Sequence, residues 1–201
     1  MKKLIVIVAT LLIAVSAHAQ FGVIAGITSS KNNIGEAAKD VQNVTQYHVG
    51  LTYKLGIGNI FAIQPSIIYN VKGAKMGDIA GYQDFDYKNG YIEIPVQLQV
   101  GVGLGSLARI YGVAEPFIGY AISNAVNAQG GVNENAFKDL GNKLEYGFGL
   151  GVGIELIKHV QVSARYFWNL GSVNNANLDA AQQAVANQKA NGIVASVALL
   201  F

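Results

Sequence analysis

The chain has 201 residues, of which 51% are apolar, and it contains 24 glycines and no cysteine, so no disulfide can stabilise the fold. There are 14 basic and 12 acidic residues, and removing Lys2 and Lys3 with a predicted leader leaves 12 against 12. A mature chain of balanced charge gives no support to nucleic-acid binding, so no nucleic-acid partner is expected.

The N-terminal segment has the layout of a secretory signal peptide. Lys2 and Lys3 precede an apolar run from Leu4 to Val15. Ala17-His18-Ala19 then supplies the small residues of a cleavage site, so cleavage is predicted after Ala19. The apolar run is too short to span a bilayer as a helix, and no cysteine follows it to carry a lipid anchor. The sequence therefore predicts a leader over 1–19 and one exported domain over 20–201.

Eight segments of the mature chain alternate apolar and polar residues with a period of two, which is the pattern of strands that are apolar on one face. In chain order they lie near residues 20–29, 46–55, 60–71, 90–100, 109–122, 144–156, 160–170 and 193–201. The segment 144–156 is the clearest, because its apolar residues alternate with Glu145, four glycines and Glu155. The segment 109–122 is the least regular, but its charges, Arg109 and Glu115, share one face.

These segments have the length that a tilted transmembrane strand needs, and their number is even. A closed sheet is the β arrangement that satisfies every backbone group in lipid. The sequence therefore predicts an all-β fold, an eight-stranded antiparallel up-and-down transmembrane barrel, whose apolar face contacts the lipid of an outer membrane.

The connections between the segments alternate in length. Short links lie around Asn59, Gly105 and Lys158. Long polar stretches lie around 30–45, 72–89, 124–142 and 172–191. Short turns on the periplasmic side and long loops outside are typical of outer-membrane barrels. This orientation places both termini in the periplasm and makes the long loops the candidates for contact with an extracellular partner.

Outward-facing aromatic residues are expected to gather at the two membrane interfaces. One predicted group lies at the strand ends that carry the short links: Phe21, Phe61 and Phe201. A second predicted group lies toward the long connections: Tyr47, Tyr69, Tyr120, Tyr146 and Trp168.

The C-terminal segment ends on an aromatic residue that bears the free carboxylate. Val197, Leu199 and Phe201 are predicted to form the signal that the barrel-assembly machinery recognises during biogenesis. The same segment is expected to close the sheet against the first strand. Nothing follows it, so no peptidoglycan-binding domain is expected.

Eight strands leave an interior just wide enough for side chains to fill, so the polar face should form a filled lumen. Charges there need partners. We expect a charge network that contains Glu93, Glu115 and Arg165, with Glu145 and Glu155 also inside. The other inward charges are expected to be Lys54, Arg109 and Lys143, and the bulky inward residues Tyr91, Tyr111, Phe117 and Phe167.

The sequence also resembles a known family over essentially the whole mature chain. The segments that carry the resemblance are Phe21 to Gly26, Gln64 to Tyr69, Tyr91 to Pro95, Pro116 to Tyr120, Gly147 to Glu155, and Arg165-Tyr166. They look like the PorT-like outer-membrane β-barrel family, which is often labelled porin-like. Glu115 departs from the family pattern, in which glycine is usual before that proline. The resemblance implies a location and a fold, and one branch of the family is implicated in protein secretion.

The residue pattern supports no catalytic site, metal site or cofactor. His48 is expected inside the barrel and His159 in a short turn, and neither has carboxylates at ligand spacing. No serine and histidine pair is expected on the lipid face, as a lipid-modifying hydrolase would need. A structural or surface-interaction role is therefore favoured, and the alternatives are a narrow solute or ion pore, an accessory of protein secretion and, last, an enzyme at the lipid interface.

Overall fold

The computed structural model describes residues 19–32, 41–42, 44–58, 60–76, 85–105, 107–128, 131–132, 144–171 and 190–201. The predicted leader lies outside this part except for Ala19, and so does Lys143. Within the described ranges no helix is long and apolar enough to cross a membrane.

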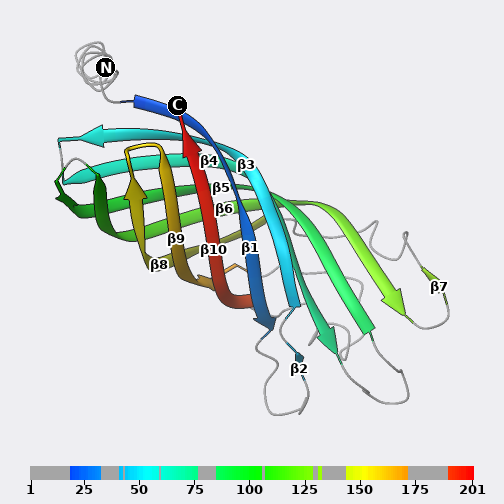
Figure 1. The fold of residues 1–201 in the computed structure, drawn as a ribbon. Coiled ribbons are helices and arrows are strands. Elements are labelled where there is room, and N and C mark those ends of the chain that lie inside the picture. The colour runs from blue at the N-terminus through cyan, green and yellow to red at the C-terminus, as the bar shows by residue number, and fades with distance from the viewer. Residues whose placement is uncertain are drawn as a thin grey trace, which may run out of the picture.

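The described strands form one antiparallel sheet that closes on itself (Figure 1). Its eight long strands are β1 (Ala19–Asn32), β3 (Val44–Ile57), β4 (Phe61–Met76), β5 (Phe85–Leu104), β6 (Ala108–Ala128), β8 (Leu144–Leu156), β9 (Val160–Asn169) and β10 (Ala190–Leu200). Each long strand pairs with the next along the chain, and β10 pairs with β1 from Gly22 opposite Leu200 to Asn32 opposite Ala190. Two short strands, β2 (Val41–Gln42) and β7 (Gly131–Val132), pair with β4 and β6. The predicted eight-stranded up-and-down barrel is confirmed.

The two ends of the barrel differ. The short connections 58–60, 105–107 and 157–159 lie at one end together with Ala19 and Phe201, and we name it the turn end (Figure 1). The strand ends that lead into the long connections lie at the opposite end, which we name the loop end. Gly58 and Gly105 have φ angles of 63° and 68°, a left-handed conformation that glycine adopts without strain. The third turn uses Ile157 and Lys158 in the same region, and the His159 amide donates to the carbonyl of Leu156 at 3.0 Å.

The alternation of the sequence becomes the two faces of the barrel wall. Apolar side chains such as Val23, Leu51 and Val197 point outward and are 41–47% exposed, although they are large hydrophobic groups. Their neighbours in the chain point inward and are buried, and many of these are polar. The barrel is therefore apolar outside and largely polar inside. This arrangement suits lipid, because water outside would favour the reverse.

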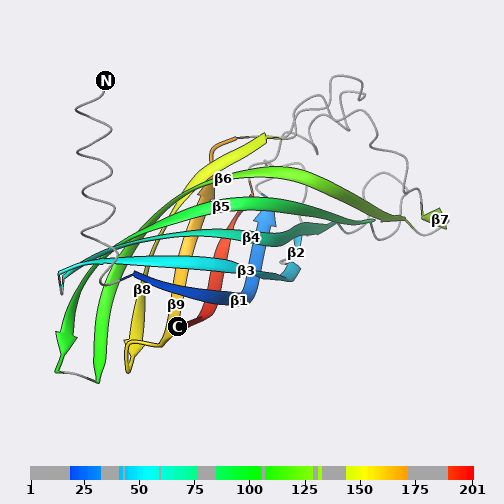
Figure 2. The same cartoon turned by 90° about the horizontal axis from the view of Figure 1, so that it is seen from above.

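Several strands extend further than the apolar pattern predicts. Residues 72–76 and 85–89 were expected in a loop but belong to β4 and β5, and 124–128 belong to β6. The barrel is thus taller along β4, β5 and β6 than along β9 and β10 (Figure 2). Near this extension the β5–β6 register shifts, so that Gly90 faces Ser123 and Tyr91 faces Ala121. Ile122 is left as the extra residue of a bulge.

Candidate functional site

The inward side chains form three polar clusters along the lumen. The loop-end cluster is Asn70, Lys72, Glu93, Glu145 and Asn169. The middle cluster is Thr28, His48, Glu115, Ser163, Arg165 and Ser196. The turn-end cluster is Thr52, Lys54, Gln64, Ser66, Gln97, Gln99, Arg109, Glu155 and Gln161.

The loop-end cluster is organised around Lys72, which is only 5% exposed. Its ammonium Nζ lies 2.5 Å from Oε1 of Glu93 and 2.6 Å from Oε1 of Glu145. The second oxygen of each carboxylate accepts from an amide: Asn70 donates to Glu93 at 3.0 Å and Asn169 to Glu145 at 2.8 Å. Both buried carboxylates are therefore held by a cation and by a neutral donor.

This cluster corrects the network expected from the sequence. Glu93 was placed with Glu115 and Arg165, whereas the structure places it beside Lys72. Lys72 itself was assigned to a long loop, because the apolar residues of that segment end at Val71. The inward series Gln64, Ser66, Ile68 and Asn70 continues to Lys72 with the same period of two. That polar alternation was the signal that could have found it.

In the middle cluster, Arg165 and Glu115 lie side by side, with the guanidinium Nε 3.0 Å from the carboxylate. Arg165 also donates to the hydroxyls of Ser163 at 2.8 Å and Ser196 at 2.9 Å. The second centre of this cluster is His48, which was expected inside the barrel but was given no partners from the sequence. Its Nε2 lies 2.9 Å from the Ser196 hydroxyl and its Nδ1 lies 3.2 Å from the Thr28 hydroxyl.

The contact between His48 and Ser196 crosses the line where the barrel closes. His48 belongs to β3 and Ser196 to β10, and β1 lies between them. Gly26 of β1 is paired with both residues. A Cβ at Gly26 would clash with the backbone carbonyl oxygen of Ala195 in β10, and it would lie 2.7 Å from Cε1 of His48 and 2.8 Å from its Nε2, so the absence of a side chain at Gly26 makes room both for the β1–β10 pairing and for the imidazole.

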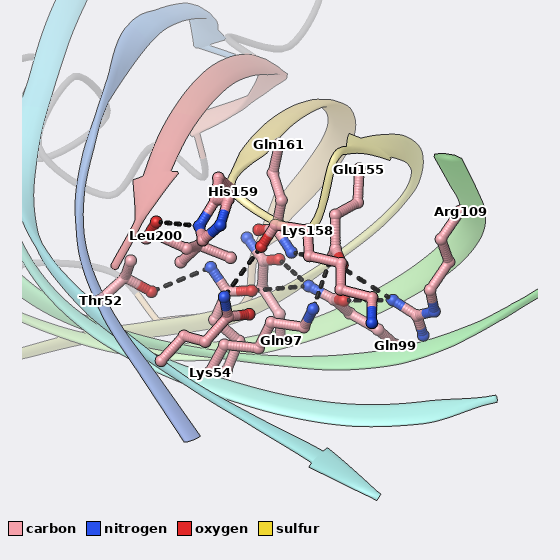
Figure 3. A network of polar contacts seen from close by, with 12 residues as sticks. Thr52, Lys54, Gln97, Gln99, Arg109, Glu155, Lys158, His159, Gln161 and Leu200 are labelled. Atoms are coloured by element: carbon pink, nitrogen blue, oxygen red, sulfur yellow. Dashed lines mark hydrogen bonds and ion pairs between the residues drawn. The ribbon is translucent and has the colours of Figure 1, made fainter. Parts of the chain in front are cut away.

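The turn-end cluster joins walls that face each other, and the members that Figure 3 labels point toward one another. Lys54 of β3 forms an ion pair with Glu155 of β8, four strands away around the eight-stranded barrel, and so spans the lumen. Gln161 donates to the same carboxylate at 2.8 Å. Arg109 donates to Gln99 at 3.0 Å and to the backbone carbonyl of Ile60 at 2.8 Å.

The charges of the described lumen residues balance as a set. Four cationic side chains (Lys54, Lys72, Arg109 and Arg165) accompany four carboxylates (Glu93, Glu115, Glu145 and Glu155). The loop-end cluster has two carboxylates for one ammonium, and the turn-end cluster has two cations for one carboxylate. Such internal pairing is what buried charges require, whether or not they have a further task.

The aromatic residues expected at the interfaces lie on the outward face. At the turn end Phe21, Phe61 and Phe201 are 51%, 52% and 73% exposed. Toward the loop end the outward aromatic residues are Tyr47, Tyr69, Tyr120, Tyr146 and Trp168. The rings also contact one another, since Trp168 stacks on Phe148 at 4.9 Å between centroids and meets Tyr166 edge-on at 4.7 Å.

The C-terminal residues take part in closing the barrel. Val197 and Leu199 point outward from β10, and the Phe201 amide donates to the carbonyl of Phe21 at 2.7 Å. Leu200 points inward, and its amide donates to the carbonyl of His159 at 2.7 Å. The last residues are thus bonded both to the first strand and to the turn before β9.

Two arrangements bear on enzymatic chemistry. His48 and Ser196 have the separation of a base and a nucleophile, but they are 1% and 3% exposed inside the lumen, and the second imidazole nitrogen faces a threonine. Among the residues that the structure describes, no group of three or more histidine or acidic side chains could hold a metal ion. The lumen geometry supports pairing and packing rather than catalysis.

Comparison with known proteins agrees with this architecture. A model of the family described as outer membrane protein beta-barrel domain matches residues 13–175. Neisserial surface protein A, a solved structure, has a TM-score of 0.50 at 15% identity, over 91% of this chain and 99% of that chain. The attachment invasion locus protein Ail of Yersinia pestis has a TM-score of 0.46 at 11% identity, with the same coverage. The comparison with curated proteins found no match.

Proposed function

Because the chain belongs to the family described as outer membrane protein beta-barrel domain, we propose that it is a closed, non-conducting barrel with a structural or surface-interaction role at the cell surface. The protein lies in the outer membrane, with its apolar outward face in the lipid. The proposal goes beyond location, because it concerns what the lumen and the two ends do.

The observation that carries the proposal is the filled lumen. Side chains from different walls meet at three levels, and at the turn end the Lys54–Glu155 pair spans it. These side chains are buried and pair with one another, so opening a path for solutes would require breaking several buried ion pairs. An eight-stranded barrel has little room beyond its inward side chains.

The orientation belongs to the same proposal. The turn end faces the periplasm and the loop end faces outward, as short turns and long loops are arranged in bacterial barrels. The outward aromatic residues at both ends then lie at the two lipid interfaces. Their rings lie in the apolar region of the bilayer, and the hydroxyl and indole groups of the tyrosines and Trp168 reach the headgroup layer. An extracellular partner would meet the long loops, which lie outside the described residues. Export through a leader cleaved after Ala19 and the PorT-like resemblance are also parts of the proposal.

The proposed role is not enzymatic. Support comes from the middle cluster, whose histidine and serine lie inside the barrel rather than at the lipid edge. Each of the eight lumen charges named above has an ion-pair partner among the described residues.

Electrical recording tests the proposal. The purified full-length barrel, inserted in planar lipid bilayers, is expected to show no steady conductance, because the three clusters occlude the lumen. A channel-forming porin prepared in the same detergent serves as the positive control. Reproducible single-channel steps from this protein would overturn the proposal and favour the narrow solute or ion pore.

A further inference from the structure

The ammonium group of Lys72 is enclosed by aromatic rings as well as by carboxylates. Nζ lies 4.6 Å from the ring centroid of Phe117, 5.1 Å from that of Phe167 and 5.4 Å from that of Tyr91. All three rings are buried, at 3–8% exposure. Glu93 and Glu145 complete the enclosure at 2.5 and 2.6 Å. We name these five residues the ammonium cage.

The barrel wall is shaped to hold the members of this cage. Gly119 of β6 is paired with Glu93 on one side and Glu145 on the other. A Cβ at Gly119 would lie 2.9 Å from Cγ of Glu93 and 3.0 Å from Cγ of Glu145. A Cβ at Gly147 would lie 2.6 Å from the ring of Phe117, and one at Gly192 would lie 2.9 Å from the ring of Phe167, and each would also clash with a backbone carbonyl of the neighbouring strand. These glycines have no side chain, so they leave room in the lumen for the side chains of the cage.

None of the five cage residues lies on the strand that supplies the ligand. They come from β5, β6, β8 and β9, whereas Lys72 projects from β4. The carboxylates keep their amide donors, Asn70 and Asn169, without Lys72. Removal of the lysine side chain beyond Cβ would therefore leave a space lined by two carboxyl groups and three rings, and an alkylammonium group bound there would restore the cation that keeps both carboxyl groups ionised.

The aromatic rings make the site more selective than an ion pair alone would be. A carboxylate alone attracts any cation, whereas ring faces attract an ammonium group through the ring quadrupole and also accept its alkyl carbons. We propose that Tyr91, Glu93, Phe117, Glu145 and Phe167 form a binding site for alkylammonium groups, and that Lys72 is the ligand that the chain itself supplies. The site is independent of the surface role, because it is defined by the cage alone.

Replacement of the tethered ligand by a free one tests the site. The Lys72→Ala variant of the full-length barrel in detergent micelles is titrated with n-butylammonium chloride, and thermal unfolding is followed. The midpoint of the variant is expected to rise by about 4 °C at a free concentration ten times the dissociation constant, and that of the wild-type barrel to stay unchanged. n-Butanol, which has the same chain without the charge, is expected to have no such effect. An equal response to butanol, or none to butylammonium, would overturn the proposal.

A second pair of variants separates a cage from a simple ion-pair cavity. Phe167→Leu, added to Lys72→Ala, removes one ring and keeps both carboxylates, and it is expected to weaken butylammonium binding about tenfold. Phe148→Leu removes an outward ring of β8 and is the matched control, with binding unchanged. Equal affinity in the two double variants would show that the rings take no part.

The test also holds if Lys72→Ala does not fold alone, since a buried pair of carboxylates without a cation is strongly destabilising. The yield of folded, heat-modifiable barrel is then measured after refolding with and without the amine. Recovery with butylammonium but not with butanol supports the site. Failure to recover with either compound would count against it.

Discussion

At the level of single residues, the lumen is stabilised by charges that each have an ion-pair partner within their own cluster. Arg165 shows the pattern, since it contacts Glu115, Ser163 and Ser196 while being 4% exposed. Such a buried charge affects the free energy of unfolding mainly because its removal leaves the opposite charge buried without a partner. Replacement of both partners by neutral side chains of similar shape costs much less than replacement of one.

This asymmetry predicts the behaviour of Arg165. Arg165→Ala should lower the free energy of unfolding by about 3 kcal/mol, because the Glu115 carboxylate is left buried without its cation. Arg165→Met combined with Glu115→Gln should recover much of that loss. Urea unfolding in lipid vesicles measures both. An unchanged unfolding midpoint for Arg165→Ala would show that the pair does not stabilise the barrel.

Which residues point inward could be predicted from the sequence, but which of them meet could not. The period of two assigns Glu93, Glu115 and Arg165 to the lumen without any knowledge of the fold. Partners across a lumen depend on strand tilt and stagger, which no local pattern records. The sequence-based network therefore paired Glu93 with the wrong residue. Lys72 was missed because the apolar face, rather than the polar face, was used to end its strand.

At the level of the strands, the apolar pattern predicts the part of each strand that meets lipid. Backbone pairing continues beyond that part, since the β5–β6 ladder extends to Phe85 opposite Ala128. Hydrogen bonding between strands does not require apolar side chains, so the pattern alone could not mark these ends. The strand order and the closure of β10 on β1 were predictable, because up-and-down barrels follow chain order.

The closing seam depends on a glycine. Gly26→Ala should press against the Ala195 carbonyl of β10 and push the His48 imidazole away from Ser196, and it should destabilise the barrel by about 1–3 kcal/mol, as overpacking of a filled interior does. Gly112→Ala is the matched control, because a Cβ there would have its nearest neighbour at 3.9 Å. Urea unfolding in vesicles compares the two variants.

A double variant shows whether the imidazole is the cause. If Gly26→Ala acts through His48, the double variant Gly26→Ala/His48→Ala should be destabilised by less than the sum of the two single variants. Equal unfolding midpoints for Gly26→Ala and Gly112→Ala would mean that the space over Gly26 is not important for closure.

At the level of the whole molecule, the C-terminal residue takes part in closing the barrel and is also the predicted signal for its assembly into the outer membrane. The Phe201 side chain is 73% exposed, while its amide bonds to Phe21. Phe201→Ala keeps the backbone bond, so refolding of the purified chain into lipid should be nearly unchanged. If the side chain is read by the assembly machinery, the yield of folded protein in the outer membrane of cells should fall severalfold.

The matched control for Phe201 is Phe61→Ala, which removes an outward ring that is 52% exposed at the same end of the barrel but lies on β4. Its yield in cells should match that of the wild type. Similar yields for the two variants would leave Phe201 with a role in the lipid interface alone.

The ion pair between Lys54 and Glu155 has a mechanical consequence. It joins strands on opposite sides of the barrel, so it fixes the diameter there. Flattening the circular cross-section into an ellipse would lengthen one diameter, and in that direction the buried pair would have to break. Lateral pressure from the bilayer therefore acts there on a braced cylinder rather than on a flexible ring, and the spacing of the strand ends that carry the short turns is kept under load.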